Sequence, residues 1–326
     1  MGSRSLKKII YGFVSVMIFF LTLYTCLSLY YRFGISVVSF LSISAFLVSL
    51  FCLYLKRFRF LYLVVYIFFF VIWLFWYINI QPSNDKNWQR DVSVLAYATI
   101  DKNLVKFYNI RNFKYTTEDR YIVSYYDETF DLDKLNGIDF IATYWMGPSI
   151  AHTFLSFSFS DGKHLAISIE VRKEVGESYS MLRGFFKQNE IYYVVADERD
   201  LIGLRTNIRK NPIEHVYMYQ IKAKKKEQER VFLNYIHKIN SLKTDPEFYN
   251  TLTTNCTTSI WKNATDKKLT WEILVSGYSA DYLYENGLLK TYGLSFKELK
   301  KRSYINPLVS GKPIDEFYSQ NIRKRD

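Results

Sequence analysis

The sequence predicts an α+β domain preceded by three transmembrane helices. Two observations support this fold class. The first 80 residues contain no Asp or Glu, although the chain has 31 acidic residues, and three long uncharged stretches fill most of them. Beyond residue 80, runs with the alternation typical of strands come first and helical patterns come later, which indicates an α+β domain and not a doubly wound one. We therefore divide the chain into a membrane anchor, residues 1–80, and an exported domain, residues 81–326.

The three uncharged stretches cover residues 9–31, 33–55 and 60–80, and each has at least 21 residues. A helix of about 20 apolar residues is long enough to cross a bilayer. A cleaved signal peptide has one apolar region of about 7–15 residues, so it does not explain three consecutive stretches. We expect three membrane crossings.

Basic residues around these stretches predict the orientation. Six of the seven basic residues in this region precede the first stretch or separate the second from the third, and only Arg32 lies between the first two. Because basic loops stay on the cytoplasmic side, the amino terminus is expected in the cytoplasm and residues 81–326 on the extracytoplasmic, or periplasmic, side of the inner membrane. The other 36 basic residues face 31 acidic ones, a mild excess. It suits a domain beside anionic lipid headgroups and does not indicate nucleic acid.

Residues 81–90 are expected to form a polar link, and the remaining residues are enough for one substantial domain. A helix is expected over 224–242, where apolar residues recur at four-residue spacing, and a second helix near Cys256. The final residues, NIRKRD, are expected to be frayed, while the stretch before them packs on the domain. Strands are expected at 120–126, 138–144, 150–159, 164–172, 191–196 and 213–221.

Cys256 is the only cysteine of the exported domain, since Cys26 and Cys52 lie in the predicted spans. Exported cysteines are usually paired, so an odd one indicates a reactive thiol or an intermolecular bond. Asn255 or Thr254 is a good N-cap for the helix that follows. A thiol in the first helical turn has its pKa lowered by the helix dipole, which favours the nucleophilic thiolate. The alternative is a buried cysteine that only fills space.

A cysteine nucleophile normally needs a histidine as its base. His237 is expected on the surface of the predicted helix 224–242, and His215 is expected to have a structural role within a strand. The other two histidines, His152 and His164, belong to one predicted hairpin.

The apolar pattern of this hairpin selects its register. Odd-numbered apolar residues in both strands share one face only if the loop has three residues, Ser160 to Gly162, with glycine in the left-handed conformation. This register places Glu170 opposite His152, and Ser158 opposite His164. Glu170 is then close enough to hold the imidazole in the tautomer that accepts a proton from the thiol. The alternative is an ordinary pair of strands with a polar, solvent-exposed face.

The segment ADERDLIGLR concentrates charge. Ion pairing among its side chains is one interpretation, and binding of a headgroup or substrate by Arg199 or Arg205 is the other.

Four blocks in order, HTFLSFSFSDGKHLAISIEVR, GESYS, YVVADERDLIGLRTN and FYNTLTTNCTTSIW, resemble the Lnb-type family of bacterial lipoprotein N-acyltransferases. That family is similar to a circularly permuted branch of the papain-like (NlpC-type) thiol enzymes. The resemblance implies a permuted papain-like domain in which Cys256 and His152 are the catalytic pair. The third catalytic role then belongs to Glu170 or to His164, because a permuted relative, lecithin:retinol acyltransferase, has a second histidine twelve residues after the first. Asn255, Arg199 and Arg205 are candidates for substrate binding.

The resemblance further implies an acyltransferase that moves a fatty acyl group through a Cys256 thioester to the terminal amino group of lipoproteins. The expected donor is a membrane phospholipid or a diacylglyceryl group. No metal and no cofactor are expected, because no close-spaced set of histidine and cysteine ligands is present. A cell-wall cysteine peptidase or amidase and a non-catalytic membrane assembly protein are the alternatives.

Overall fold

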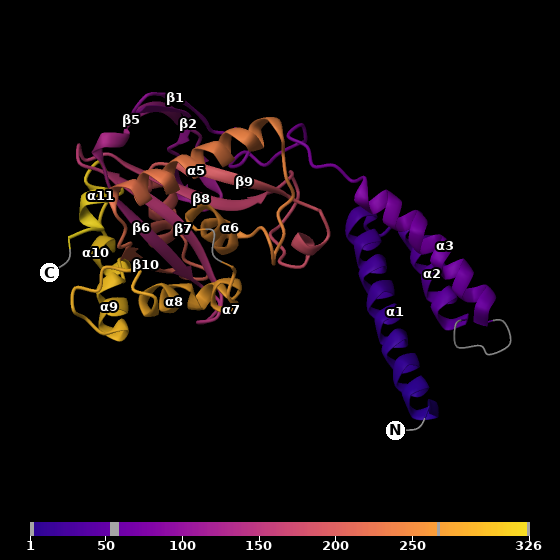
Figure 1. Ribbon diagram of the computed structural model, residues 1–326. Helices are drawn as coiled ribbons and strands as arrows, with labels where there is room; N and C mark the ends of the chain where they lie inside the picture. The colour runs from indigo at the N-terminus through magenta and orange to yellow at the C-terminus, as the bar shows by residue number, and fades with distance from the viewer. Residues whose placement is uncertain (1–2, 53–58, 266–267, 325–326) are drawn as a thin grey trace. The chain divides into compact units, whose positions relative to one another are not determined.

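The computed structural model describes residues 3–52, 59–265 and 268–324 (Figure 1). The chain divides into two compact units. The first comprises Met1–Pro82 together with Ser180–Gln188, and the second comprises Ser83–Tyr179 together with Asn189–Asp326. The first unit thus begins as expected but also takes in a short segment from the middle of the chain, which the sequence pattern did not indicate.

The first unit contains three helices, α1 (Ser3–Phe33), α2 (Val37–Cys52) and α3 (Arg59–Ile78). Two of the described helices are long and apolar enough to cross a membrane, over Gly12–Phe33 and Phe60–Ile78. The apolar part of α2 is shorter among the described residues, and the last three residues of the second expected span lie outside them. Apolar helices are therefore present in all three places, and the three crossings stay a prediction.

Polar and aromatic side chains hold this unit together. Trp73 Nε1 donates to Ser28 Oγ at 2.9 Å between α3 and α1. The segment Ser180–Gln188 packs on the same helices, since Tyr24 donates to the carbonyl of Phe185 at 3.0 Å and the Tyr31 ring stacks on Phe186. Many other apolar side chains of the helices remain exposed, as lipid-facing residues do.

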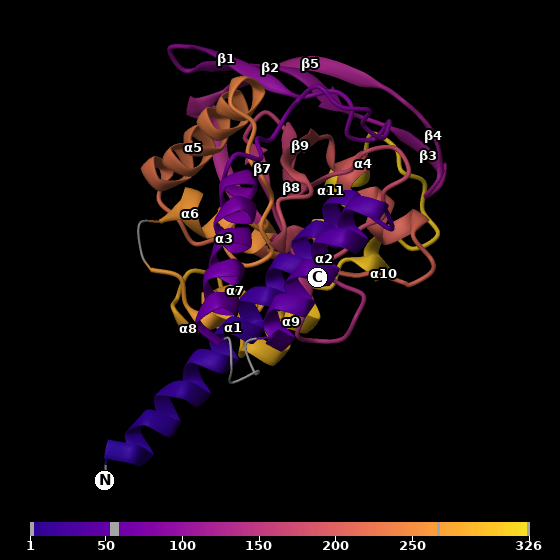
Figure 2. The same ribbon diagram turned by 90° about the vertical axis from the view of Figure 1, so that its right-hand side faces the viewer.

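The second unit is built on one eight-stranded sheet with the order β1-β2-β9-β8-β7-β6-β10, in which β5 also pairs with β2. All its neighbours are antiparallel except β2 and β9. Figure 2 shows β1, β2 and β5 together at one edge. The strand bounds are β1 (Tyr97–Asp101), β2 (Leu104–Arg111), β5 (Tyr125–Asp131), β6 (Leu135–Tyr144), β7 (Ala151–Phe159), β8 (His164–Arg172), β9 (Glu190–Ala196) and β10 (His215–Gln220). A separate hairpin joins β3 (Lys114–Thr117) and β4 (Arg120–Ile122).

Both faces of the sheet are covered. On one face α5 (Lys225–Thr244) and α6 (Cys256–Ala264) enclose an apolar cluster that includes Phe157 and Phe232 (Figure 1). On the other face α4 (Glu198–Gly203), the π-helix η4 (Leu204–Ile208), α10 (Asn306–Val309) and α11 (Tyr318–Asn321) enclose a second cluster that includes Phe154. Between α6 and α10, α7 (Trp271–Leu274) packs on α6, while α8 (Ser279–Glu285) and α9 (Phe296–Ser303) contribute Leu283 and Leu299 to the first cluster. The mixed α+β class is confirmed.

The predicted hairpin register is confirmed. Phe157 pairs with Leu165 and Ser158 pairs with His164. Gly162 has a φ of 84° at the end of the three-residue loop, a conformation that glycine adopts without strain. The alternative of a solvent-exposed polar face is wrong, because Ser156 is fully buried and donates a hydrogen bond to Glu198 of α4.

The expected fraying of the last residues is wrong for those that the structure describes. Ile322 is fully buried in the second cluster, and Arg323 forms ion pairs with Asp139 and Glu198. The expected polar link also packs on the second unit, because Trp88 is buried and bridges to Glu174. In each of these two polar segments one apolar side chain, Trp88 or Ile322, is buried against the domain.

Candidate active site

Cys256 is the first residue of α6, and Asn255 is the N-cap. The Asn255 side chain accepts from the Thr258 amide at 2.8 Å, and the Thr258 hydroxyl accepts from the Asn255 amide at 3.0 Å. This reciprocal cap satisfies two amides at the helix start. The Thr257 hydroxyl lies 2.9 Å from the Thr153 hydroxyl of β7, so the first turn of α6 is fastened to the strand that carries His152.

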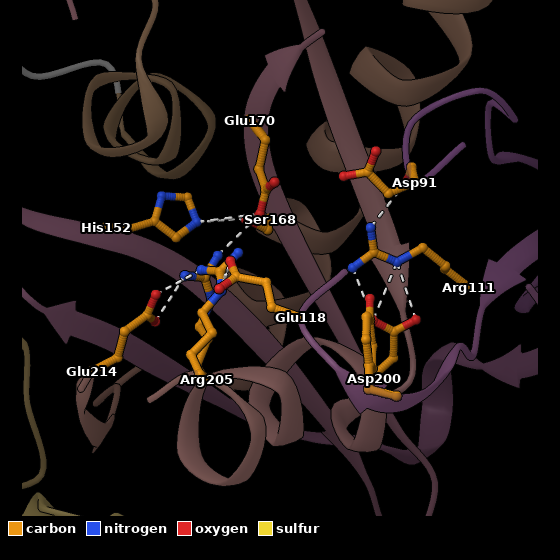
Figure 3. Close-up of polar contacts among 11 residues, drawn as sticks. Asp91, Arg111, Glu118, His152, Ser168, Glu170, Asp200, Arg205 and Glu214 are labelled. Atoms are coloured by element: carbon orange, nitrogen blue, oxygen red, sulfur yellow. Dashed lines mark hydrogen bonds and ion pairs between the residues drawn. The ribbon is translucent and has the colours of Figure 1, made fainter. Parts of the chain in front are cut away.

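His152 is the second residue of β7 and lies beside Ser168 and Glu170 of β8 (Figure 3). Ser168 Oγ donates to Glu170 at 2.9 Å, and His152 Nε2 lies 2.8 Å from the same Oγ. Glu170 Oε1 is 3.5 Å from Nε2. With the Ser168 proton directed at Glu170, Nε2 carries a proton and Nδ1 is left as the basic nitrogen.

The thiol and imidazole interact directly. Burial on its own raises the pKa of Cys256, but a hydrogen bond and charge interaction with His152, together with a backbone hydrogen bond from Thr153, bring it down to about 6. Burial and Arg205 lower the pKa of His152, yet hydrogen bonds with Cys256 and Glu170 raise it above its usual range. These two opposite shifts are those of a thiolate–imidazolium pair. The residue Cys256 is buried, with 9% of its surface exposed.

Glu170 is the third member of this group. Burial raises the pKa of its carboxyl, but the hydrogen bond to His152 and the charges of His152 and Arg205 hold it well below the usual range. Glu170 is therefore an anion that can orient the imidazole and stabilise its protonated form.

His164 does not lie in this group. It starts β8 at the loop end of the hairpin, where Nδ1 is 3.0 Å from Ser158 Oγ. Six residues of extended strand separate it from Glu170, about 20 Å. Burial lowers the pKa of His164. It lines a pocket of about 370 Å³ that also contacts Lys163 and Arg199. The geometry therefore favours Glu170 over His164 for the third role.

The charged side chains of ADERDLIGLR form ion pairs. Arg199 pairs with Asp197 at 2.6 Å, and Arg205 lies 3.2 Å from Glu170 and 3.1 Å from Glu214. Of the three candidates for substrate binding, Asn255 is adjacent to the thiol as a helix cap and Arg205 lies behind Glu170. Arg199 lies near the loop end with His164.

The remaining histidines lie elsewhere. His215 bonds to the Tyr304 hydroxyl, and His237 is exposed on α5. Ser168, which the sequence reasoning did not assign to the site, completes the hydrogen-bond path from His152 to Glu170. The confirmed register was sufficient to find it, because Ser168 shares a face with Glu170. Among the described residues, no group of three or more His, Cys, Asp or Glu side chains is arranged to hold a metal ion.

Fold and site together define a class, an α+β domain with a paired thiol and imidazole in a chain that also has membrane-type apolar helices. Residues 121–276 match the model of the Lnb N-terminal periplasmic domain, and this part of the chain belongs to that family. The expected family is thereby confirmed, and the matched segment contains His152, Glu170 and Cys256. Searches of curated proteins and of solved structures gave no match. The family and the apolar helices are those of a membrane protein with an extracytoplasmic domain.

Proposed function

We propose that this protein is a membrane-bound thiol acyltransferase that moves a fatty acyl group from a lipid to the terminal amino group of bacterial lipoproteins. The observation that carries the proposal is the Cys256–His152–Glu170 group, in which the thiol pKa is about 6 and the imidazole is anchored by a carboxylate. The Lnb family match supports lipoproteins as the acceptors.

In the first half of the reaction, the Cys256 thiolate attacks the ester carbonyl of the donor lipid. The ester C–O bond then breaks, a thioester forms on the sulfur, and His152 gives its proton to the departing alcohol oxygen. Amides in the first turn of α6 stabilise the oxyanion. In the second half, the amino group of the lipoprotein attacks the thioester, His152 takes the proton from nitrogen, and the thiolate leaves. The sum is an ester and an amine converted into an alcohol and an amide.

Apolar side chains near the thiol support a lipid donor. Tyr179, Leu252 and Trp271 are 56%, 52% and 61% exposed. The charge of Cys256 contributes to the raised pKa of Tyr179, Leu252 precedes the thiol by four residues, and Trp271 belongs to α7, which packs on α6. Exposed large apolar residues around a site are typical of surfaces that meet lipid or apolar ligands.

The proposal includes a multi-pass anchor in the inner membrane with a cytoplasmic amino terminus. The basic residues around the apolar stretches and the periplasmic family of residues 121–276 support this orientation.

Two measurements test the function. Intact-mass analysis of the purified chain with phospholipid should show an acyl adduct that hydroxylamine releases and that Cys256→Ser lacks. Mass spectrometry of lipoprotein amino termini should show acylation in cells with the wild-type chain and its loss with Cys256→Ser. Unchanged acylation with Cys256→Ser would refute the proposal. Cleavage of muropeptides without an acyl adduct would support a peptidase instead.

A further inference from the structure

A series of alternating charges links Glu170 to Glu118, whose side chain is 48% exposed (Figure 3). Arg205 donates to Glu170 Oε1 at 3.2 Å and, through its other terminal nitrogen, to Glu214 Oε2 at 3.1 Å. Arg209 donates to the second oxygen of Glu214 at 2.6 Å, and its Nε lies 2.8 Å from Glu118. Only the first anion of the series touches the imidazole of His152.

Arg205 is enclosed by protein groups. Its side chain and that of Glu214 are each 6% exposed, and its guanidinium lies over the ring of Phe154 at 5.6 Å. The residue sits in the π-helix η4, where the Arg209 amide donates to the carbonyl of Leu204, five residues back. Such wide turns are rare and occur frequently at functional sites. Here the turn carries a guanidinium that bridges the partly exposed carboxylate of Glu170 and the buried carboxylate of Glu214.

We propose that Arg205 is a positioning residue for the Cys256–His152 pair, acting through Glu170 and not through substrate. The inference rests on the proposed roles of the thiol and imidazole. Glu170 Oε1 accepts from Ser168 at 2.9 Å and from Arg205 at 3.2 Å, and these two donors restrict its rotation. The carboxylate is thereby presented to His152 in one orientation. A planar fork is suited to this bridge, since a lysine ammonium matches the geometry of two carboxylates less well.

Arg205 has two opposing electrostatic effects. Its charge favours the ionised form of Glu170 and disfavours the imidazolium form of His152. The direct effect of the Arg205 charge on the pKa of His152 is larger than that of the hydrogen bond to Glu170. The positioning role therefore rests on the two hydrogen bonds that hold the Glu170 carboxylate and not on the charge of Arg205. The ionisable groups that interact with the thiol, the imidazole or Glu170 include Arg111, Tyr179, Tyr192, Arg205, Arg209, Tyr235 and Tyr249.

The test measures alkylation of Cys256 by iodoacetamide in the full-length chain in detergent, between about pH 5 and 9, with the rate read at the Cys256 peptide by mass spectrometry. Arg205→Met and Glu170→Gln should each slow alkylation at pH 7 by at least about 3-fold and move the profile to higher pH. The double variant should be no slower than the slower single variant, because both changes remove the same support. The control Arg199→Met changes an arginine of the neighbouring α4 that pairs with Asp197, and it should leave the profile unchanged.

Rates that multiply in the double variant would mean that Arg205 acts independently of Glu170. A shift to lower pH in Arg205→Met would mean that it acts only as a remote charge. Either result, or an unchanged profile, would overturn the proposal.

Arg205→Met removes one of the two cations that pair with Glu214, and this loss could disturb folding. A second pair of variants with milder changes therefore accompanies it. Arg205→Lys keeps the charge and loses the fork, and Glu214→Gln removes the far anchor. Both should move the profile in the same direction by a smaller amount, and wild-type profiles in both would also overturn the proposal. Alkylation needs no acyl substrate. If these shifts appear while wild-type chain forms no acyl adduct, the proposed function fails and the role of Arg205 stands.

Discussion

At the scale of the residue, Cys256 owes its ionisation to its neighbours. Burial opposes the thiolate, and the imidazole of His152, together with hydrogen bonds from Thr153 and Thr257, more than offsets that effect. The reactivity of this site therefore depends on one imidazole.

The alkylation rate of Cys256 should report this dependence. In the wild-type chain the rate should fall as pH drops through about 6, because the lowered pKa keeps the thiolate down to that pH. His152→Ala removes the largest stabilising partner, so the midpoint should rise above pH 8, toward the usual range of a buried thiol. Rates read by mass spectrometry against pH would check this. A midpoint near 6 in His152→Ala would show that the helix start alone lowers the pKa.

The third catalytic role can be assigned with two variants. Glu170→Gln keeps the shape of the side chain and removes the charge that anchors the imidazole, so acyl transfer should fall by about 10²-fold or more. His164→Asn should reduce transfer by less than about 3-fold, since His164 bonds to Ser158 at the other end of the hairpin. Initial rates of lipoprotein acylation at saturating donor would compare them. The reverse ranking would assign the role to His164.

At the scale of the element, the start of α6 determines where the thiol lies. The cap formed by Asn255 and Thr258 begins the helix directly before Cys256, and the hydroxyl contact between Thr153 and Thr257 fixes that turn to β7. A helix that began one residue later would leave the thiol outside the helical turn. The cap is therefore as important to the chemistry as it is to the stability of the helix.

Asn255→Ala should test this double role. Loss of an N-cap usually lowers the free energy of unfolding by about 0.5–2 kcal/mol, and the frayed turn should also slow alkylation of Cys256 at pH 7. Ser295→Ala removes the cap of α9 and is the matched control. It should cost a similar free energy in denaturant unfolding and leave alkylation unchanged. Equal alkylation rates in Asn255→Ala and Ser295→Ala would show that the cap of α6 does not affect the reactivity of Cys256.

The hairpin and the helix cap could be predicted from the sequence because both follow local rules. Alternation of apolar residues selected the register of β7 and β8, and the polar residues before Cys256 indicated a cap. The strands β1 and β2 and the turn η4 were not predicted. Their conformation depends on distant partners, such as the parallel contact of Arg111 with Ala196 and the bridge from Arg205 to Glu214. Contacts between residues far apart in the chain leave no periodic pattern in the sequence.

At the scale of the molecule, a partly buried cation ties the end of the chain to β6 of the sheet and to α4. Arg323 pairs with Asp139 at 2.9 Å and with Glu198 at 2.7 Å, and Glu198 accepts from the Ser156 hydroxyl. Composition alone marked the last residues as polar and frayed. The expectation failed because it could not show that two buried carboxylates required a counter-ion.

This cluster should make the stability of the extracytoplasmic domain sensitive to acid. Arg323 overcomes the effect of burial and lowers the pKa of Glu198 to about 2. A lowered pKa stabilises the folded state above the usual range of Glu, and this contribution of about 3 kcal/mol is lost as pH falls through about 2. Glu198→Gln should abolish that acid dependence and cost about 3–5 kcal/mol at pH 7 by leaving Arg323 short of a partner. Urea unfolding followed by near-ultraviolet circular dichroism would measure both.

Glu247→Gln provides the control for that measurement. Glu247 is half exposed and pairs with Lys238 at the surface, so its loss should cost at most about 1 kcal/mol. A similar cost for both variants would argue against the buried cluster as the source of acid sensitivity.

The two-sided covering of the sheet has a practical consequence for anyone preparing this domain. The segment that defines the family ends at residue 276, whereas Val309, Tyr318 and Ile322 shield Phe154 and its neighbours. A fragment trimmed to residues 121–276 would contain every residue of the proposed catalytic group. It would nevertheless expose the apolar face of the sheet around Phe154 to water, and such exposed apolar surfaces favour aggregation. An expressed fragment should therefore begin at or before Ser83 and include Arg323, whose ion pairs hold the end of the chain.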